Sequence, residues 1–174
     1  MAVSAEIVIR VARPADAAAV GRVLSASYPS LMGEAYDVRL LSRALPLMTR
    51  ASPVLLSGGT YYLAERSSEA GLQAVGCGGW SAERPGTGAL EPGLGHIRHF
   101  ATDAAWIGRG IGRALCERCV ADARAHGLSR LECYASLNGE AFYHALGFRR
   151  IGDIAVAMGP DLIFPSIRMV RPLR

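Results

Sequence analysis

The chain contains no lysine, and arginine alone carries its basic charge. Basic residues number 19 against 15 acidic ones, which gives a formal net charge of +4. The arginines are scattered along the chain, whereas nucleic-acid-binding surfaces usually gather their basic residues. We therefore expect no nucleic-acid partner. A modest positive balance instead suits a small anionic ligand.

Long apolar runs are also missing. No uninterrupted run approaches the roughly 20 apolar residues that a transmembrane helix needs. The opening residues, "MAVSAEIVIRVARPAD", lack the basic start and apolar segment of a signal peptide and have the pattern of a first strand. We expect a cytoplasmic protein without a membrane partner.

Cysteine is sparse, at four residues. Cys116 and Cys119 have the C-x-x-C spacing of some metal and redox sites, but no second such pair and no His-x-x-x-His accompanies them. Both lie on the apolar face of a helical pattern that begins at Ile111. We predict buried core thiols there and at Cys133, no metal site, and a reducing compartment.

Strand and helix patterns alternate along the chain. Strands are expected at residues 7–12, 60–66, 74–83, 96–102 and 129–135, with a strand start at 148–152 and further strands around 153–158 and 164–170. Helices are expected at 15–26, from Asp37 to near Pro46, from the glycine-rich segment to His126, and at 138–146. Residues 49–59 and 84–95 are predicted loops.

This order of elements predicts one α+β domain over residues 1–174. Its centre is expected to be a mixed, mostly antiparallel sheet of six to seven strands, flanked by about four helices. The strand–helix–strand unit of residues 96–135 should be a right-handed crossover, which makes its two strands parallel.

The segment "WIGRGIGRAL", residues 106–115, places three glycines between a strand and a helix. Free backbone N–H groups at a helix N-terminus, together with the helix dipole, form an anion site suited to phosphate. Glycines 108, 110 and 112 carry no Cβ atoms to hold a pyrophosphate away. A tight turn without a ligand is the structural alternative. The spacing is neither a Rossmann fingerprint nor a P-loop.

Two arginines lie within this segment. Arg109 and Arg113 add positive charge to the anion site. Arg113 has an alternative partner, because Glu117 follows one helical turn later.

The run from His96 to Phe148 resembles the Gcn5-related N-acetyltransferase (GNAT) superfamily. Its members carry a loop of the form Gln/Arg-x-x-Gly-x-Gly/Ala before a long helix, then a strand and a helix with a tyrosine before Gly-Phe. This chain has "IGRGIG" at 107–112 and "SLNGEAFYHALGF" later, and "IRVARPADAAAVGRVL" is similar to the family's first strand and helix. Ile107 occupies the usual Gln/Arg position, so a side-chain contact is lost there.

The resemblance implies acetyl-CoA, or another acyl-CoA, as the acyl donor. Its pantetheine arm would lie beside one strand, at a bulge, and its pyrophosphate on the loop. The implied cofactor-binding residues are Phe100, Ala101, Thr102, Gly108, Arg109, Gly110, Ile111, Gly112 and Arg113. Many members also carry an asparagine seven residues before the tyrosine. Here that position is Ser136 and the nearby asparagine is Asn138, so either is a candidate.

The implied reaction is direct acyl transfer to an amine. Tyr143 matches the family tyrosine, and a phenol of pKa about 10 is protonated at neutral pH and can donate to the leaving sulfur. A packed core aromatic is the alternative. His96 is our candidate base, with Glu65 and Glu83 as rivals. A strict period of two would put His96 on the same face as the cofactor strand's Phe100, unless a bulge intervenes, and His99 on the other.

The acceptor amine is not identified by the sequence. Polyamines, aminoglycosides, amino acids and peptide or protein amines all remain open. Tyr61, Tyr62 and Trp80 are candidate acceptor contacts or core aromatics, and residues 84–95 are a candidate cover. A catalytically silent acyl-CoA sensor and a phosphate- or nucleotide-binding protein unrelated to CoA are the alternative functions. The C-terminal strands could pair two subunits into a homodimer.

Overall fold

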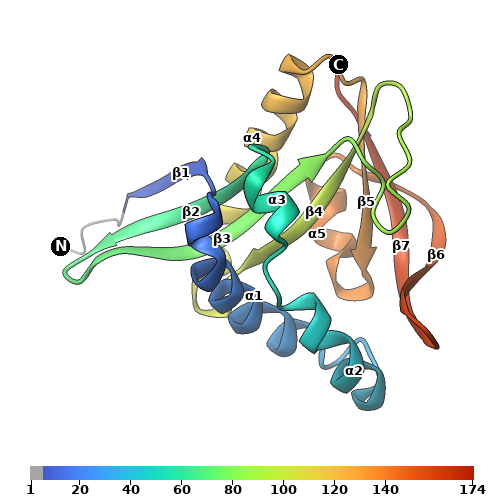
Figure 1. The fold of residues 1–174 in the computed structure, drawn as a ribbon, viewed down its shortest axis with the longest axis horizontal. Helices are drawn as coiled ribbons and strands as arrows, with labels where there is room; N and C mark the ends of the chain where they lie inside the picture. The colour runs from blue at the N-terminus through green and yellow to red at the C-terminus, as the bar shows by residue number, and fades with distance from the viewer. Residues whose placement is uncertain (1–5) are drawn as a thin grey trace.

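The computed structural model describes residues 6–174 and builds them around one sheet (Figure 1). Its strands are β1 (Ile7–Val11), β2 (Tyr61–Ser68), β3 (Gly71–Ser81), β4 (Leu94–Thr102), β5 (Arg130–Ser136), β6 (Arg149–Gly159) and β7 (Leu162–Pro172). Its α-helices are α1 (Ala17–Met32), α2 (Val38–Met48), α3 (Pro53–Ser57), α4 (Ile111–Ala125) and α5 (Glu140–Ala145).

The seven strands follow the order β1-β2-β3-β4-β5-β7-β6. Within this sheet β4 and β5 are the parallel neighbours, and the other pairs are antiparallel. The predicted fold class and the predicted parallel pairing across the strand–helix–strand unit are confirmed. The remaining short helical turns include Ala104–Trp106 before α4 and Leu137–Gly139 before α5.

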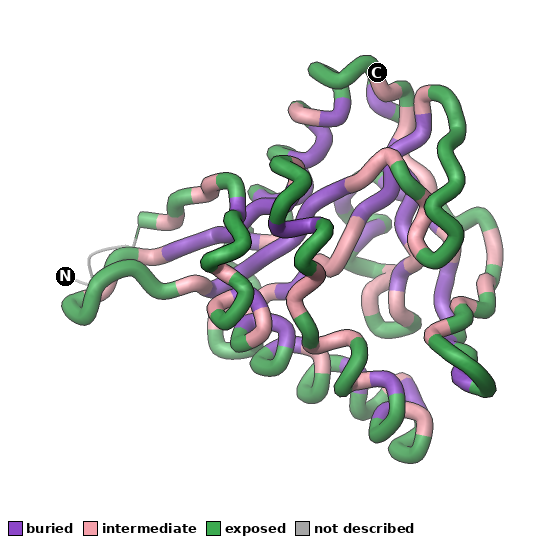
Figure 2. Tube along the Cα trace, viewed as in Figure 1, coloured by how far each residue is buried: buried purple, intermediate pink, exposed green. Residues whose placement is uncertain are grey.

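Buried residues lie along the central strands and the inner faces of the helices (Figure 2). The core on one face of the sheet packs against α4 and contains Cys116, Cys119 and Cys133. The core on the opposite face packs against α1 and contains Cys77. All four thiols are free and buried, which confirms the prediction made for Cys116, Cys119 and Cys133. Burial raises the pKa of Cys116 to about 11, so this thiol stays protonated at neutral pH.

Two predicted boundaries were wrong in the N-terminal half. Residues 53–57 form α3 rather than loop, because Ser52 caps the first turn and Pro53 occupies a position where its missing N–H costs nothing. Helix α1 continues to Met32 rather than ending at Ala26, even though it contains Pro29. The buried side chain of Met32 joins a further core cluster with α2 and β7, which favours the longer helix.

Strand β4 carries a bulge that bends it away from regular pairing. Cys77 pairs with Ala101 and Gly79 pairs with Arg98, so one residue of β3 opposes two of β4. One of those two, His99, has φ of 49°, in the left-handed region. The residue opposite is Gly78, where a Cβ would lie 2.5 Å from the Phe100 ring, so the close approach of the two strands requires glycine.

Beyond the bulge, β4 and β5 separate. Their parallel register covers only Leu94, Gly95 and His96 of β4, opposite Arg130, Leu131 and Glu132 of β5. The bulge therefore leaves a gap in the middle of the sheet, between the last residues of β4 and those of β5.

Candidate active site

A cleft of about 830 Å³ follows this gap. It begins at the glycine loop before α4, passes between the ends of β4 and β5, and continues to α1, α2 and the β6–β7 hairpin. The expected pantetheine strand, Phe100, Ala101 and Thr102, lines it. A space between two strands that do not pair can hold an extended ligand in the position of an added strand.

One end of the cleft is the N-terminus of α4, where no side chain forms a capping hydrogen bond. The N-cap of α4 is Gly110, with φ of 78°. Gly108 also has positive φ, at 80°, and a Cβ at either glycine would meet nothing within 4 Å. Both positions need glycine for their backbone conformation, and both face open space. The first-turn N–H groups of α4 therefore face open space, a geometry that suits an anion.

The third glycine, Gly112, also lines the cleft, so its expected contact with the donor stays a prediction, and it has a packing role as well. A Cβ on Gly112 would lie 2.8 Å from the Phe142 ring of α5, so its absence lets the two helices approach closely. The alternative pairing of Arg113 with Glu117 is also wrong. Glu117 pairs with Arg171 at 3.1 Å, and Arg113 donates a 3.4 Å hydrogen bond to the Ala145 carbonyl.

Two arginine side chains lie against the ring of Trp106, next to the glycine loop. The guanidinium groups of Arg66 and Arg109 lie 4.4 Å and 4.3 Å from the centre of the Trp106 ring. Trp106 also lines the cleft. The ring thus holds two cations beside the helix N-terminus, where they add to the potential that attracts phosphate.

Tyr143 lies in the cleft wall inside an aromatic cage. Its ring makes edge contacts with Phe100, Phe142 and Phe148, at centroid distances between 5.0 and 6.4 Å. Burial raises the pKa of the Tyr143 hydroxyl well above its ordinary value of 10.0. The phenol is therefore protonated at neutral pH, and it lines the same cleft as the bulge of β4.

Ser136 and Asn138 both line the cleft. They lie at the end of β5 and in the helical turn before α5. The Leu137 N–H between them donates a 2.8 Å hydrogen bond to the hydroxyl of Tyr36. This bond holds the turn against the segment that joins α1 to α2. Either residue remains a candidate contact for the donor.

His96 and Glu132 face each other across the parallel part of the sheet. Their exposed fractions are 2% and 1%, and both line the cleft. Arg168 Nε of β7 donates a 2.6 Å hydrogen bond to Glu132 Oε1. Among residues 6–174, His96 Nε2 and Glu132 Oε2 have no hydrogen-bond partner. Burial lowers the pKa of His96, and the Glu132 charge opposes that shift in part.

Sequence reasoning missed Glu132. The signal for it was a single carboxylate in the middle of the apolar strand "RLECYAS", where an unpaired charge would be costly.

The bulge also changes which faces the histidines occupy. Ile97 and Phe100 both pack on the α4-side core although they are three residues apart. His96, adjacent to Ile97, therefore lies on the opposite face from Phe100, contrary to a strict period of two. His99 lies at the bulge and lines the cleft, and burial lowers its pKa to about 4.

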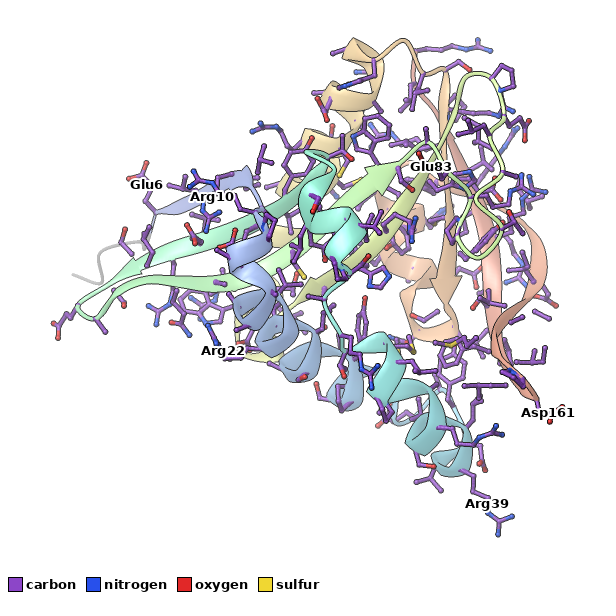
Figure 3. All side chains as sticks on the ribbon, in the orientation of Figure 1. Glu6, Arg10, Arg22, Arg39, Glu83 and Asp161 are labelled. Carbon is purple, nitrogen blue, oxygen red and sulfur yellow. The ribbon has the colours of Figure 1, made fainter. Side chains whose placement is uncertain are left out.

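The rival bases lie elsewhere. Glu65 accepts from Arg10 at 2.9 Å and faces a separate hollow beside α1. Glu83 is exposed beyond the end of β3; both it and Arg10 are labelled in Figure 3. Neither glutamate lines the cleft.

The candidate aromatic contacts are core residues. Tyr61 is buried on the α1 side, and its hydroxyl donates to the His99 carbonyl at 2.8 Å. Tyr62 and Trp80 both donate to Asp122 of α4. None of the three lines the cleft, whereas Pro85 of the predicted covering loop does.

Residues 6–174 contain no group of three or more His, Cys, Asp or Glu side chains arranged to hold a metal ion. Nor does this part of the chain include a helix with the length and apolar character needed to cross a membrane.

Known proteins share this fold and part of this sequence. A GCN5-related N-acetyltransferase structure from Rhodopseudomonas palustris superposes with a TM-score of 0.77 at 20% identity, covering 99% of both chains. The PaiA N-acetyltransferase of Thermoplasma acidophilum, solved with coenzyme A, superposes with a TM-score of 0.69 at 13% identity, covering 96% of this chain and 99% of that one. These likenesses establish the fold.

Sequence comparison adds a family. Serotonin N-acetyltransferase 2, chloroplastic, of Oryza sativa subsp. japonica is 45% identical over 56 residues, which is 32% of this chain and 24% of the rice protein. The matched region therefore spans about a quarter of that relative's length. The family model for the acetyltransferase (GNAT) domain matches residues 67–163, more than half of the chain. The protein belongs to the GNAT acetyltransferase family.

Proposed function

We propose that this protein transfers an acetyl group from acetyl-CoA directly to the amino group of a small molecule or peptide. The carrying observation is one continuous cleft that joins an uncapped, glycine-built helix N-terminus to the bulge of β4 and to Tyr143. The family membership supports an acyl-CoA-dependent acetyltransferase in general, and the cleft supports the specific roles below.

The residues present fit the donor. Gly108 and Gly110 leave open space where side chains would stand, and the first-turn N–H groups of α4 suit a pyrophosphate. Arg109 adds charge at this end. The separated segment of β4, Phe100 to Thr102, would pair with the extended arm of the donor, with Ser136 or Asn138 on the far side of the gap. The bound donor supplies an activated acetyl thioester.

Two proton movements accompany the transfer. An ammonium cannot attack, so its extra proton passes to His96, directly or through one water, and then to solvent. The low pKa of His96 keeps its ring neutral at pH 7 and able to accept this proton. The nitrogen–carbon bond forms and the carbon–sulfur bond breaks. The departing sulfur takes a proton from the Tyr143 hydroxyl, which regains one from the amide nitrogen.

Paired isoleucines test the phosphate end. Ile107 in the loop and Ile151 on β6 are each 49% exposed, but only Ile107 lines the cleft. Ile107→Glu should weaken acetyl-CoA binding by about tenfold or more, because it places a negative charge in the cleft lining beside the proposed phosphate position. Ile107→Arg should strengthen it, and Ile151→Glu should leave it unchanged. Isothermal titration of the folded variants measures all three.

An activity assay on the wild-type protein tests the proposed function itself. Release of free CoA with acetylated amine, measured across a broad amine panel, is the expected result. If acetyl-CoA does not bind, or if equal effects arise from Ile107→Glu and Ile151→Glu, the proposed donor site is wrong. Binding without any acetyl transfer would instead identify a silent acyl-CoA sensor.

A further inference from the structure

We infer that the acceptor is a monoamine with an apolar body, whose amino group binds between Glu132 Oε2 and His96 Nε2. This inference rests on the proposed acetyl transfer and names the substrate class for the same cleft. The acceptor would occupy the end of the cleft that lies away from the glycine loop. The sequence alone assigned no residues to that end.

The walls of this end are mostly apolar. They come from α1, α2 and the hairpin of β6 and β7, which gather at one end of the molecule (Figure 1). The apolar residues that line the cleft there are Leu31, Met32, Leu47, Met48, Val156, Met158 and Phe164, and the same elements add Ser27, Tyr28 and Ser166. Methionine is unbranched and polarisable, so such a wall adapts to flat or flexible apolar groups. Transfer of an apolar body from water to these walls favours binding.

The charges of the cleft suit one ammonium and no more. Among the described residues that line it, Glu132 is the single carboxylate. A polyamine would need a carboxylate for each further cation, since an unpaired charge in an apolar wall is costly. The cations of the described lining are Arg98 and Arg113. Arg113 lies in the first turn of α4, and Arg98 Nη1 donates to Ser81 Oγ at 2.9 Å on β3. An acceptor with its own carboxylate would therefore have to share the Arg98 guanidinium with Ser81.

The floor of this end needs a hydrogen-bond donor. Arg168 satisfies Glu132 Oε1, but Glu132 Oε2 and His96 Nε2 are buried without a partner within residues 6–174. An unmade hydrogen bond of a buried polar group costs about 1–3 kcal/mol, and more if the group is charged. An amino group carries several N–H bonds and can satisfy both atoms at once. The same contact would hold the nitrogen beside the group that takes its proton.

Matched acceptors test the inference. Hexylamine and 1,6-diaminohexane differ by a second ammonium, and 2-phenylethylamine and phenylalanine differ by a carboxylate. We expect each monoamine to have a kcat/KM at least about tenfold higher than its charged counterpart. The second ammonium meets no further carboxylate in the described lining, and the added carboxylate would have to share Arg98 with Ser81. Calorimetric binding of the same four compounds in the presence of CoA gives the ranking independently of turnover.

Variants locate the site. Glu132→Gln keeps the shape but replaces an acceptor with a donor, and should raise the monoamine KM about tenfold while the acetyl-CoA KM stays unchanged. Leu31 lines the cleft and is 40% exposed. Leu31→Glu should raise the monoamine KM and lower the diamine KM. Leu72→Glu, 67% exposed and outside the cleft, is the matched control. Leu31→Glu does not touch the buried pair, so it remains informative if Glu132→Gln fails to fold.

The two levels of proposal fail differently. Preference for the diamine or the amino acid, with acetyl transfer intact, would overturn the monoamine inference and leave the acetyltransferase in place. Failure of the monoamines to bind would overturn it as well. Monoamine binding with no acetyl transfer to any amine would support the acceptor site and overturn the catalytic function.

Discussion

The hydroxyl of Tyr61 on β2 donates a 2.8 Å hydrogen bond to the carbonyl of His99, the residue with φ of 49° in the β4 bulge. The hydroxyl of Tyr28 on α1 donates to the next carbonyl, that of Phe100, at 2.9 Å. Two phenols from separate elements therefore satisfy the irregular part of β4 on the α1 side. The bulge depends on its neighbours as well as on its own residues.

Removing one of these hydroxyls should destabilise the protein and disturb the cleft. Tyr61→Phe leaves the buried His99 carbonyl without this donor and should lower the free energy of unfolding by about 1–3 kcal/mol. Urea unfolding measures this loss. Tyr62→Phe on the same strand removes a hydroxyl that donates to Asp122, so it should also lower stability. Only Tyr61→Phe should raise the acetyl-CoA KM, and equal KM values would argue against a bulge held by Tyr61.

Tyr143→Phe should lower kcat by about 100-fold, the usual size of a positioned general acid's contribution. The ring and its cage of phenylalanines remain, so the acetyl-CoA KM and the melting temperature should change little. Steady-state kinetics with a thiol-release assay gives both constants. A wild-type rate at every pH would remove Tyr143 from the mechanism.

The acid limb of the pH profile should belong to His96. Burial lowers its pKa below 6.5, so the neutral ring that accepts a proton persists at pH 7 and is lost only as the pH falls through that lowered value. The rate should therefore be flat near neutral pH and decline on acidification. His96→Gln should lower kcat/KM about 100-fold and abolish this limb.

His99 supplies the control for that experiment. Its pKa of about 4 makes it a weak base at the same cleft. His99→Asn suits the positive φ at this position, because asparagine is enriched in the left-handed region. This variant should keep the acid limb. If the limb disappears in His99→Asn and survives in His96→Gln, the base assignment is wrong.

Arg109 should contribute to donor affinity through its charge. Arg109→Gln removes one of the two cations on Trp106 beside the helix N-terminus and should weaken acetyl-CoA binding about fivefold at low salt. The loss should shrink as ionic strength rises. Arg118→Gln is the control. Arg118 of α4 lies against the Tyr62 ring of β2, more than one turn beyond the helix N-terminus. Equal losses in both variants would indicate a general charge effect.

Much of the fold could be predicted from local patterns. Glycine punctuation, β-branched runs and helical spacing placed β2, β3, β5 and the long helix α4 close to their observed bounds. Helix α3 was not predicted, because a helix of about one turn is too short to show a periodic hydrophobic pattern. Its stability comes from the burial of Leu55 and Leu56 in the core on the α1 side.

The site was less accessible to such reasoning. The glycine loop and Tyr143 have local signatures, so their sequence contexts sufficed to propose them. The face of His96 could not be deduced, because it depends on where the bulge shifts the alternation of β4. The pairing of Glu132 with His96 and Arg168 joins three strands and therefore has no local signal at all.

Three register pairs join β4 to β5, and beyond them nothing in the ladder ties the two parts of the sheet together. The sheet thus consists of two parts, β1 to β4 and β5 to β7, that are joined by a short region of strand pairing. A donor that forms hydrogen bonds with both β4 and β5 would link the two parts of the sheet. Binding of the donor would then stabilise the arrangement of strands that forms its own site.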